Sequence, residues 1–298
     1  MTNILITGGT GLVGRRLISL LLKEGYTVGV LSRRDVKLKN VQSFLWTDFT
    51  VDIEALRFAD VIVHLAGANV GEKRWTRNRK KEITNSRVAT AELIRKGLFD
   101  NKIKIDAFIC ASAVGFYGEG ADDVLTEKSS NVTKDFLSDV CEEWENKAQD
   151  FSSICRVASV RIGFVLDKNA DGFKKLVKPV RFGIGASLGT GNQYMSWIHL
   201  DDLVHIFLTV IKDDCFSGPV NACSPNPLTN SELTKKVARH LQKPLFMPNV
   251  PQIILRLLLG EMADLALVGY RVFPKKLIDH GFTFQYPTLE GSLKEIYN

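Results

Sequence analysis

The sequence predicts a doubly wound α/β fold with a parallel sheet and an interleaved, mainly helical lobe toward the C-terminus. Short apolar runs that suit buried strands alternate with amphipathic segments as far as about residue 166. From residue 229 onward, Pro and Gly divide the chain into short helical pieces. Alternation of strand and helix implies parallel strands, right-handed crossovers and helices on both faces of the sheet.

The spacing of apolar residues predicts each element in turn. Near-continuous apolar runs predict buried strands at residues 3–7, 27–33, 60–68, 106–115 and 153–166, with a weaker strand near Phe44. Helical spacing predicts helices over residues 12–23, 76–99 and 136–149. Residues 182–203 are rich in glycine and aromatic residues and have no clean period, which indicates ordered loops around a site.

Composition is that of an ordinary globular protein. The 298 residues are 45% hydrophobic and 24% charged, and the net charge of +6 suits an anionic ligand but is too diffuse to predict nucleic-acid binding. Five cysteines without metal-ligand spacing indicate free thiols and no metal site. The most apolar stretch, residues 251–269, is interrupted by charged residues, and the N-terminus lacks a signal-peptide pattern. We therefore expect a cytoplasmic protein without a membrane segment.

The glycines between the first strand and the first helix predict a dinucleotide-binding turn. Gly8, Gly11 and Gly14 match the spacing G-x-x-G-x-x-G. The first permits the tight turn, the second lets the backbone approach a pyrophosphate, and the third lets the helix pack closely on the strand. The backbone N–H groups of Leu12 and Val13 would receive the pyrophosphate. A glycine-rich turn without a ligand is the alternative.

The end of the second strand indicates which dinucleotide is bound. Sites that prefer NAD place an acidic residue there to hold the ribose 2′-hydroxyl, whereas this chain has Ser32, Arg33 and Arg34. A guanidinium binds a 2′-phosphate through charge-assisted hydrogen bonds, worth about 1.5–3 kcal/mol each. NADP(H) is therefore the predicted cofactor, and Thr10 of the glycine turn is counted in its site. Arginines that are merely solvated at a strand end are the alternative.

The carboxyl ends of the third and fourth strands predict further cofactor contacts. Asp48 is placed to contact the adenine, although a surface turn would suit it nearly as well. Leu65, Ala66 and Gly67 begin a run of small residues at a strand end, where the backbone can approach the cofactor closely.

Motif order gives the chain a family resemblance. The segments “TGGTGLVG”, “HLAGA”, “SAVGFYG”, “VRIGFVL” and “WIHLDDL” follow one another as in the extended short-chain dehydrogenases/reductases, the sugar-nucleotide epimerase-like group. More narrowly, “FLSDVCEEWE”, “GTGNQYMSWIHLDDL” and residues 260–296 resemble an atypical branch of NAD(P)-dependent epimerase-family or cell-division-inhibitor-like proteins. The resemblance covers essentially the whole chain.

The chain departs from that family where its usual acid/base pair is expected. Members commonly carry Tyr-x-x-x-Lys on the helix after the fifth strand. The tyrosine acts as general acid/base, and the lysine lowers its pKa and holds the nicotinamide ribose. With Glu145 as the anchor, these positions fall at Leu137 and Cys141. Leucine is inert and cysteine carries no ammonium group, so the standard pair is absent.

Two hydroxyl groups near the end of the fifth strand remain candidates for catalysis. By resemblance Ser112 takes the place of the family's catalytic hydroxyl, although a shift of one residue would put Ala113 there. Tyr117 lies where extended members carry a pocket tyrosine, and it would either donate a proton or only line the pocket. Without a nearby cation its pKa would stay near about 10, which favours reduction over alcohol oxidation.

The remaining site residues are implied by the resemblance. Glu82 and Arg87 are expected to contact the nicotinamide half of the cofactor, with a surface ion pair between them as the alternative. Asp202 is expected to orient a loop, and no metal is expected beside it because adjacent aspartates on a strand end point apart. The expected substrate-pocket residues are Arg161, Gln193, Trp197 and His199.

Together these features predict an NADP(H)-dependent oxidoreductase or epimerase-like enzyme that acts on a small carbonyl or sugar-type substrate. The rival is an NADP(H)-binding regulatory or scaffolding protein whose catalytic pair has decayed. Residues 1–166 would form the NADP-binding Rossmann domain, joined by strands that return to its sheet at about 190–223. Residues 167–298 would supply substrate-side loops and the helical lobe. The expected partner is a small molecule rather than nucleic acid or membrane, with a homodimer left open.

Overall fold

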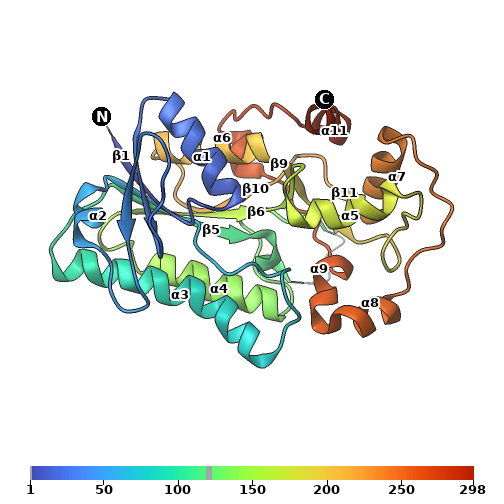
Figure 1. The fold of residues 1–298 in the computed structure, drawn as a ribbon, viewed down its shortest axis with the longest axis horizontal. Helices are drawn as coiled ribbons and strands as arrows, with labels where there is room; N and C mark the ends of the chain where they lie inside the picture. The colour runs from blue at the N-terminus through green and yellow to red at the C-terminus, as the bar shows by residue number, and fades with distance from the viewer. Residues whose placement is uncertain (1, 119–122) are drawn as a thin grey trace.

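The computed structural model describes residues 2–118 and 123–298 and shows the doubly wound α/β fold that the sequence predicts (Figure 1). The described residues form a seven-stranded parallel sheet in the order β10-β6-β5-β4-β1-β2-β3. Its strands are β1 (Asn3–Thr7), β2 (Thr27–Ser32), β3 (Val41–Leu45), β4 (Val61–His64), β5 (Ala107–Ala113), β6 (Arg156–Ile162) and β10 (Gly218–Ala222). The strand order changes direction between β1 and β4, which creates a topological switch point.

Helices cover both faces of the sheet (Figure 1). On one face α1 (Leu12–Lys23) packs against α6 (Leu200–Lys212), and on the other α3 (Arg77–Asp100) packs against α4 (Phe136–Gln149). The short α2 (Ile53–Phe58) lies beside α3. Because both faces are covered, β4 is buried along its whole length and β5 in all but its last residue, as their apolar runs predicted.

The chain leaves the main sheet at Gly163. A Cβ at this position would lie 2.4 Å from the carbonyl oxygen of Ser196, so only glycine permits the two segments to approach so closely. The single strand predicted at residues 153–166 is therefore divided into β6 and β7 (Phe164–Leu166). Two small sheets follow, in which β7 pairs with β9 (Trp197–His199) and β8 (Tyr194–Met195) pairs with β11 (Leu228–Thr229).

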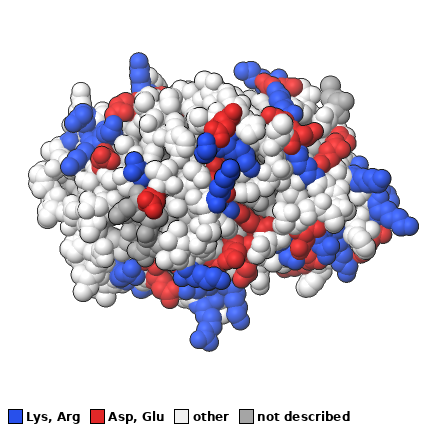
Figure 2. Space-filling view, turned by 180° about the vertical axis from the view of Figure 1, so that it is seen from behind, with Lys and Arg blue, Asp and Glu red and all other residues white. Residues whose placement is uncertain are grey.

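The C-terminal lobe is built mainly from short helices. None of the helices in residues 2–118 and 123–298 is long and apolar enough to cross a membrane. Basic and acidic side chains are interspersed over the face seen in Figure 2. The lobe contains α5 (Asp171–Arg181), α7 (Asn230–His240), α8 (Gln252–Leu259), the 3-10 turn η2 (Gly260–Ala263), α9 (Asp264–Leu267), α10 (Lys275–Asp279) and α11 (Leu289–Tyr297). Another 3-10 turn, η1 (Val114–Tyr117), directly follows β5 and contacts α4.

Candidate cofactor cleft

A cleft of about 790 Å³ opens at the carboxyl ends of the strands around the switch point. Its walls are the glycine turn after β1, the ends of β2 and β3, the segment after β4 and one side of α3. Ligands of doubly wound sheets bind at this edge. The predicted cofactor residues that line it are Gly8, Thr10, Gly11, Ser32, Arg33, Asp48, Leu65, Ala66, Gly67 and Glu82.

The glycine turn has the shape that a dinucleotide pyrophosphate requires. Gly8 has a φ of +71°, and a Cβ there would lie 2.8 Å from the backbone of Leu65. A Cβ on Gly14 would lie 2.5 Å from the carbonyl oxygen of Gly8, so α1 packs directly on the turn. The first N–H groups of α1 are those of Leu12 and Val13. Within the described chain, no side chain caps this end of the helix. These N–H groups are available to an anion, so the residues present fit the cofactor.

A basic cavity of about 720 Å³ adjoins the cleft and shares Thr10, Ser32 and Arg33 with it. Arg34 lines this cavity, as do Arg15 and Lys37, which sequence reasoning missed. The Arg15 Nε donates a hydrogen bond of 2.8 Å to the Thr10 carbonyl oxygen, which holds its guanidinium beside the turn. In the sequence, the position of Arg15 directly after Gly14 was the feature that could have indicated a place beside the turn. Four cationic side chains at one end of the cleft suit a phosphate group.

His64 supports the cleft wall from beneath. Its ring is fully buried, with Nδ1 2.8 Å from the Thr7 hydroxyl oxygen and Nε2 3.3 Å from that of Thr90. The same Thr7 oxygen accepts a hydrogen bond from the backbone N–H of Ala66. Burial lowers the pKa of His64 to about 4, so the ring is neutral at pH 7. The segment “HLAGA” contained this residue, but nothing in its spacing indicated the buried partners.

Acid is expected to destabilise the protein through His64. The pKa of His64 is about 4 in the folded protein, below its usual value of 6.5. Between pH 6.5 and pH 4, His64 is therefore protonated in the unfolded chain but neutral in the folded protein. Roughly 3 kcal/mol of stability at pH 7 is therefore lost as the pH falls from about 6.5 to 4. Urea unfolding across this range should show a shallower loss in His64→Asn than in wild type, with exposed His240→Asn as control. Equal pH dependence in all three proteins would contradict this account.

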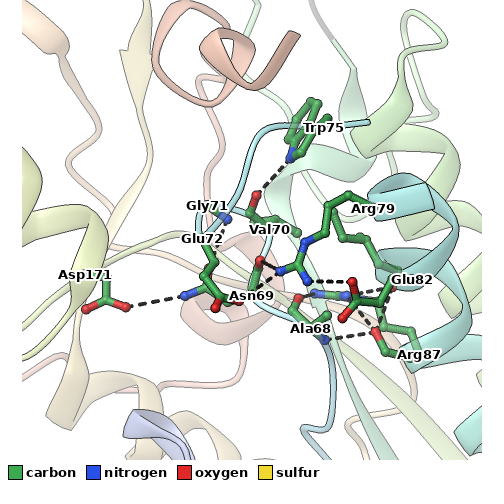
Figure 3. Close-up of polar contacts among 12 residues, drawn as sticks. Ala68, Asn69, Val70, Gly71, Glu72, Trp75, Arg79, Glu82, Arg87 and Asp171 are labelled. Carbon is green, nitrogen blue, oxygen red and sulfur yellow. Dashed lines mark hydrogen bonds and ion pairs between the residues drawn. The ribbon is translucent and has the colours of Figure 1, made fainter. Parts of the chain in front are cut away.

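Glu82 and Arg87, which the resemblance places beside the nicotinamide half of the cofactor, do not form the surface ion pair that was the alternative. Glu82 Oε2 lies 2.8 Å from Arg79 Nη1, so Glu82 pairs with Arg79 and not with Arg87 (Figure 3). Arg87 instead donates to the carbonyl oxygen of Ala68 at 3.1 Å, and a Cβ on Gly67 would lie 2.9 Å from its Cζ. Arg87 thus supports the backbone that forms the cleft wall. Its direct contact with the cofactor stays a prediction.

Ser112 belongs to a buried charged network. Its hydroxyl donates a 2.7 Å hydrogen bond to Glu145, whose two carboxylate oxygens accept hydrogen bonds of 2.8 Å from Arg161. Cys141 lies on α4 one turn before Glu145, and burial raises the pKa of its thiol to about 12. Ser112 and Arg161 are both almost fully buried. In this conformation the Ser112 hydroxyl is directed to a carboxylate rather than to a ligand.

Tyr117, the last residue of η1, is fully buried and does not line the cleft. Its hydroxyl lies 2.7 Å from Asn221 Oδ1 and 3.0 Å from the carbonyl oxygen of Thr126. Burial raises its pKa to about 12, although the cation of Arg161 lies 4.9 Å from the ring and opposes this rise. We expected no cation near Tyr117 and a pKa near about 10. Both expectations are wrong, because Arg161 lies near the ring and burial raises the pKa. A proton-donor role stays a prediction, and this placement does not support it.

The four expected substrate-pocket residues all have structural partners, and none lines either cavity above. Gln193 donates to the carbonyl oxygens of Leu188 and Ala266, and Trp197 donates to that of Asn226. Arg161 donates a hydrogen bond to Glu145. The ring of His199 accepts a hydrogen bond from the backbone N–H of Asp201 and pairs with Glu295.

Asp202 accepts hydrogen bonds from the backbone N–H groups of Gln285 and Tyr286, and so orients that loop.

A smaller cavity of about 110 Å³ lies between the start of α4 and the C-terminal lobe. Leu137, at the position of the family's tyrosine, forms part of its lining together with Trp75 and Phe136. Lys80 brings an ammonium group to it and pairs with Glu261 of the lobe. Its lining also includes the carboxyl groups of Asp135, Glu261 and Asp264, so apolar and charged side chains share a space that is smaller than a typical small-molecule pocket.

Comparison with known proteins identifies relatives along the whole chain. The NAD dependent epimerase/dehydratase family matches residues 4–159, and a domain of unknown function, DUF1731, matches residues 250–296. Epimerase family protein YfhF of Bacillus subtilis is 34% identical, with 99% of this chain and 97% of YfhF covered. The chloroplastic SDR39U1 homolog of Arabidopsis thaliana is 33% identical, with 98% of this chain and 85% of that protein covered.

A solved structure agrees with these matches. Human epimerase family protein SDR39U1, isoform 2, determined with NADPH, superposes with a TM-score of 0.86 at 27% identity and 99% coverage of both chains. The fold is therefore one that binds a nucleotide cofactor, and its cleft lies where the glycine turn predicted it. This protein belongs to the NAD dependent epimerase/dehydratase family and has the fold of the short-chain dehydrogenases/reductases.

Proposed function

We propose that this protein binds NADP(H), with the 2′-phosphate in the basic cavity. The observation that carries the proposal is the continuity of that cavity with the nucleotide cleft through Thr10, Ser32 and Arg33. A phosphate between the guanidinium groups of Arg33 and Arg34 gains charge-assisted hydrogen bonds that a 2′-hydroxyl cannot match. The presence of NADPH in the human SDR39U1 structure supports the proposal.

The chain's residues have separate tasks in this proposal. The N–H groups at the start of α1 bind the pyrophosphate, and Asp48 lies at the end of the cleft expected for the adenine. Bound NADPH supplies a hydride. The described residues of α4 carry no Tyr-x-x-x-Lys, so the protein does not deliver a proton by the family's usual pair.

Reduction of a small carbonyl or sugar-type substrate is the second candidate function. The 110 Å³ cavity favours it, because its lining combines apolar side chains with the ammonium group of Lys80 and several carboxylates, which can bind and orient a small polar compound. NADPH consumption with a series of small carbonyl compounds separates the candidates. Turnover that is lost in Lys80→Met supports the reductase. Tight NADPH binding with no turnover of any compound supports the regulatory or scaffolding function.

Replacing Arg33 and Arg34 together by serine is expected to raise the Kd for NADPH by about tenfold or more. The reason is the loss of at least one charge-assisted hydrogen bond worth about 1.5–3 kcal/mol. The Kd for NADH should change less than about twofold, because NADH has no 2′-phosphate. Titration followed by nicotinamide fluorescence gives both constants. Lys39→Gln, an exposed cation outside the basic cavity, is the matched control. Equal weakening of both nucleotides would contradict the assignment.

A further inference from the structure

The outward side of α8 is apolar although it is exposed. Ile253, Ile254, Leu257 and Leu258 lie at helical spacing on one side of this helix, and each is 44–78% exposed. Leu255, on the other side, is buried in the lobe. A helix that is apolar on both sides is normally buried on both. The outward residues therefore indicate a surface that a further molecule covers.

Neighbouring segments of the lobe extend this surface. The loop after α5 lies beside the segment that leads into α8, because the backbone N–H of Val250 donates to Ser187 and the Val250 carbonyl oxygen accepts from Gly189. Nine of the sixteen large apolar side chains that are exposed in the described residues lie between positions 182 and 265. We call these nine residues the apolar face. Besides the four of α8, they are Phe182, Ile184, Phe246, Met247 and Leu265.

Exposed cations border the apolar face on two sides. On one side lies the basic segment 73–81, because Arg74 Nη2 is 3.5 Å from the carbonyl oxygen of Leu257, and Lys80 pairs with Glu261 just after α8 (Figure 1). On the other side, basic residues stand shortly before the two exposed phenylalanines in the chain. Among the described residues, the exposed cations of these segments that form no ion pair are Lys73, Arg74, Arg77, Lys81, Lys178, Arg181 and Lys243.

The charge of this border distinguishes two molecules that could cover the apolar face. In a symmetric dimer the face would meet itself, so the cations of one copy would approach the same cations of the other. The acidic residues of residues 243–270, Glu261 and Asp264, already pair with Lys80 and Arg256 and could not relieve this repulsion. An anionic lipid surface instead offers phosphate groups to the cations and the edge of its acyl layer to the apolar side chains.

We propose that the apolar face and its cationic border bind the surface of an anionic lipid bilayer, with α8 lying in the plane of that surface. The expectation of no membrane partner rested on the charged residues that interrupt residues 251–269, and these exclude a helix that spans a bilayer but not one that lies on it. None of the nine apolar residues lines the nucleotide cleft or the basic cavity, so this inference is independent of the proposed NADP(H) function.

Flotation of the whole protein with lipid vesicles tests the proposal. Wild type is expected to bind vesicles of equimolar phosphatidylcholine and phosphatidylglycerol at least about tenfold more tightly than vesicles of phosphatidylcholine alone, because each cation near an anionic surface strengthens binding about fivefold. High salt should remove most of this difference, since it screens the charges. Ile253→Ser/Leu257→Ser should weaken binding to the anionic vesicles at least about tenfold, because both side chains lose the apolar environment that they enter on binding.

Matched variants show whether these positions act specifically. Lys73→Gln/Arg77→Gln should weaken binding to the anionic vesicles about tenfold. Lys39→Gln/Lys104→Gln, at two exposed cations elsewhere, and Phe99→Ser, at the far end of α3, should each change it less than about twofold. All of these side chains are exposed, and a thermal melt checks that each variant folds.

Three results would overturn the proposal: equal binding to the two kinds of vesicle, binding to neither, or full binding by Ile253→Ser/Leu257→Ser. Sedimentation without lipid then identifies the other molecule that could cover the apolar face. A wild-type dimer that dissociates in the same double variant would show that a second copy takes the place of the lipid surface.

Discussion

Replacing Arg161 by methionine is expected to lower the free energy of unfolding by about 3–5 kcal/mol. The substitution leaves Glu145 as an almost buried carboxylate without its cation, and breaking one side of a buried pair has a cost of this size. Ser112 alone would then donate to that carboxylate. Urea unfolding at pH 7 measures the change.

Two controls distinguish a buried pair from a general loss of charge. Arg256→Met, in the more exposed pair with Asp264, should cost less than about 1 kcal/mol. The double variant Glu145→Leu/Arg161→Met removes both charges and should recover most of the stability, because no unpaired charge remains. A single variant as stable as wild type would show that Arg161 is not the structural residue that its contacts indicate.

Replacing Gly8 by alanine is expected to cost about 3 kcal/mol or more and to abolish NADPH binding. Left-handed backbone costs a non-glycine residue about 1–2 kcal/mol. The added methyl group would also lie 2.8 Å from the backbone of Leu65, and overpacking of this kind costs about 1–3 kcal/mol. Backbone cannot rotate away as a side chain can, so the glycine turn and the segment after β4 must separate.

Gly25 provides the matched control for this substitution. Its φ of +85° is also left-handed, but a Cβ there would meet nothing within 4 Å. Gly25→Ala should therefore cost only the backbone strain, about 1–2 kcal/mol, and should leave NADPH affinity unchanged. Equal losses of stability in the two variants would contradict the close contact between the glycine turn and the cleft wall.

Sequence reasoning succeeded where local chemistry decides the structure. The bounds of α1 and α4 agree with the predicted helices, because α1 begins directly after Gly11 and ends before Gly25, and a capping box at Asp135 starts α4. The strand prediction at residues 153–166 was too long because its break at Gly163 depends on a contact with Ser196, 33 residues away. Such a contact leaves no local signal.

The same limit applies to the site. The glycine turn and the two arginines after β2 could be predicted because each motif acts through its own neighbours. Arg79 was indistinguishable from the solvated cations around it in “KRWTRNRKK”, since its burial depends on the fold of the segment before it. Tyr117 and Trp197 were expected in the pocket, yet their partners, Asn221 and Asn226, come from distant parts of the chain.

The central claim is that the cleft and its basic cavity together bind NADP(H), and the thermal midpoint of the whole protein with each nucleotide tests it most directly. A ligand that binds only the folded state stabilises it by about 2.7 kcal/mol at one hundred times its Kd. At equal concentration, NADPH should raise the Tm clearly more than NADH, and the difference should vanish in the Arg33→Ser/Arg34→Ser variant. An equal rise with both nucleotides in wild type, or no rise with NADPH, would contradict the account.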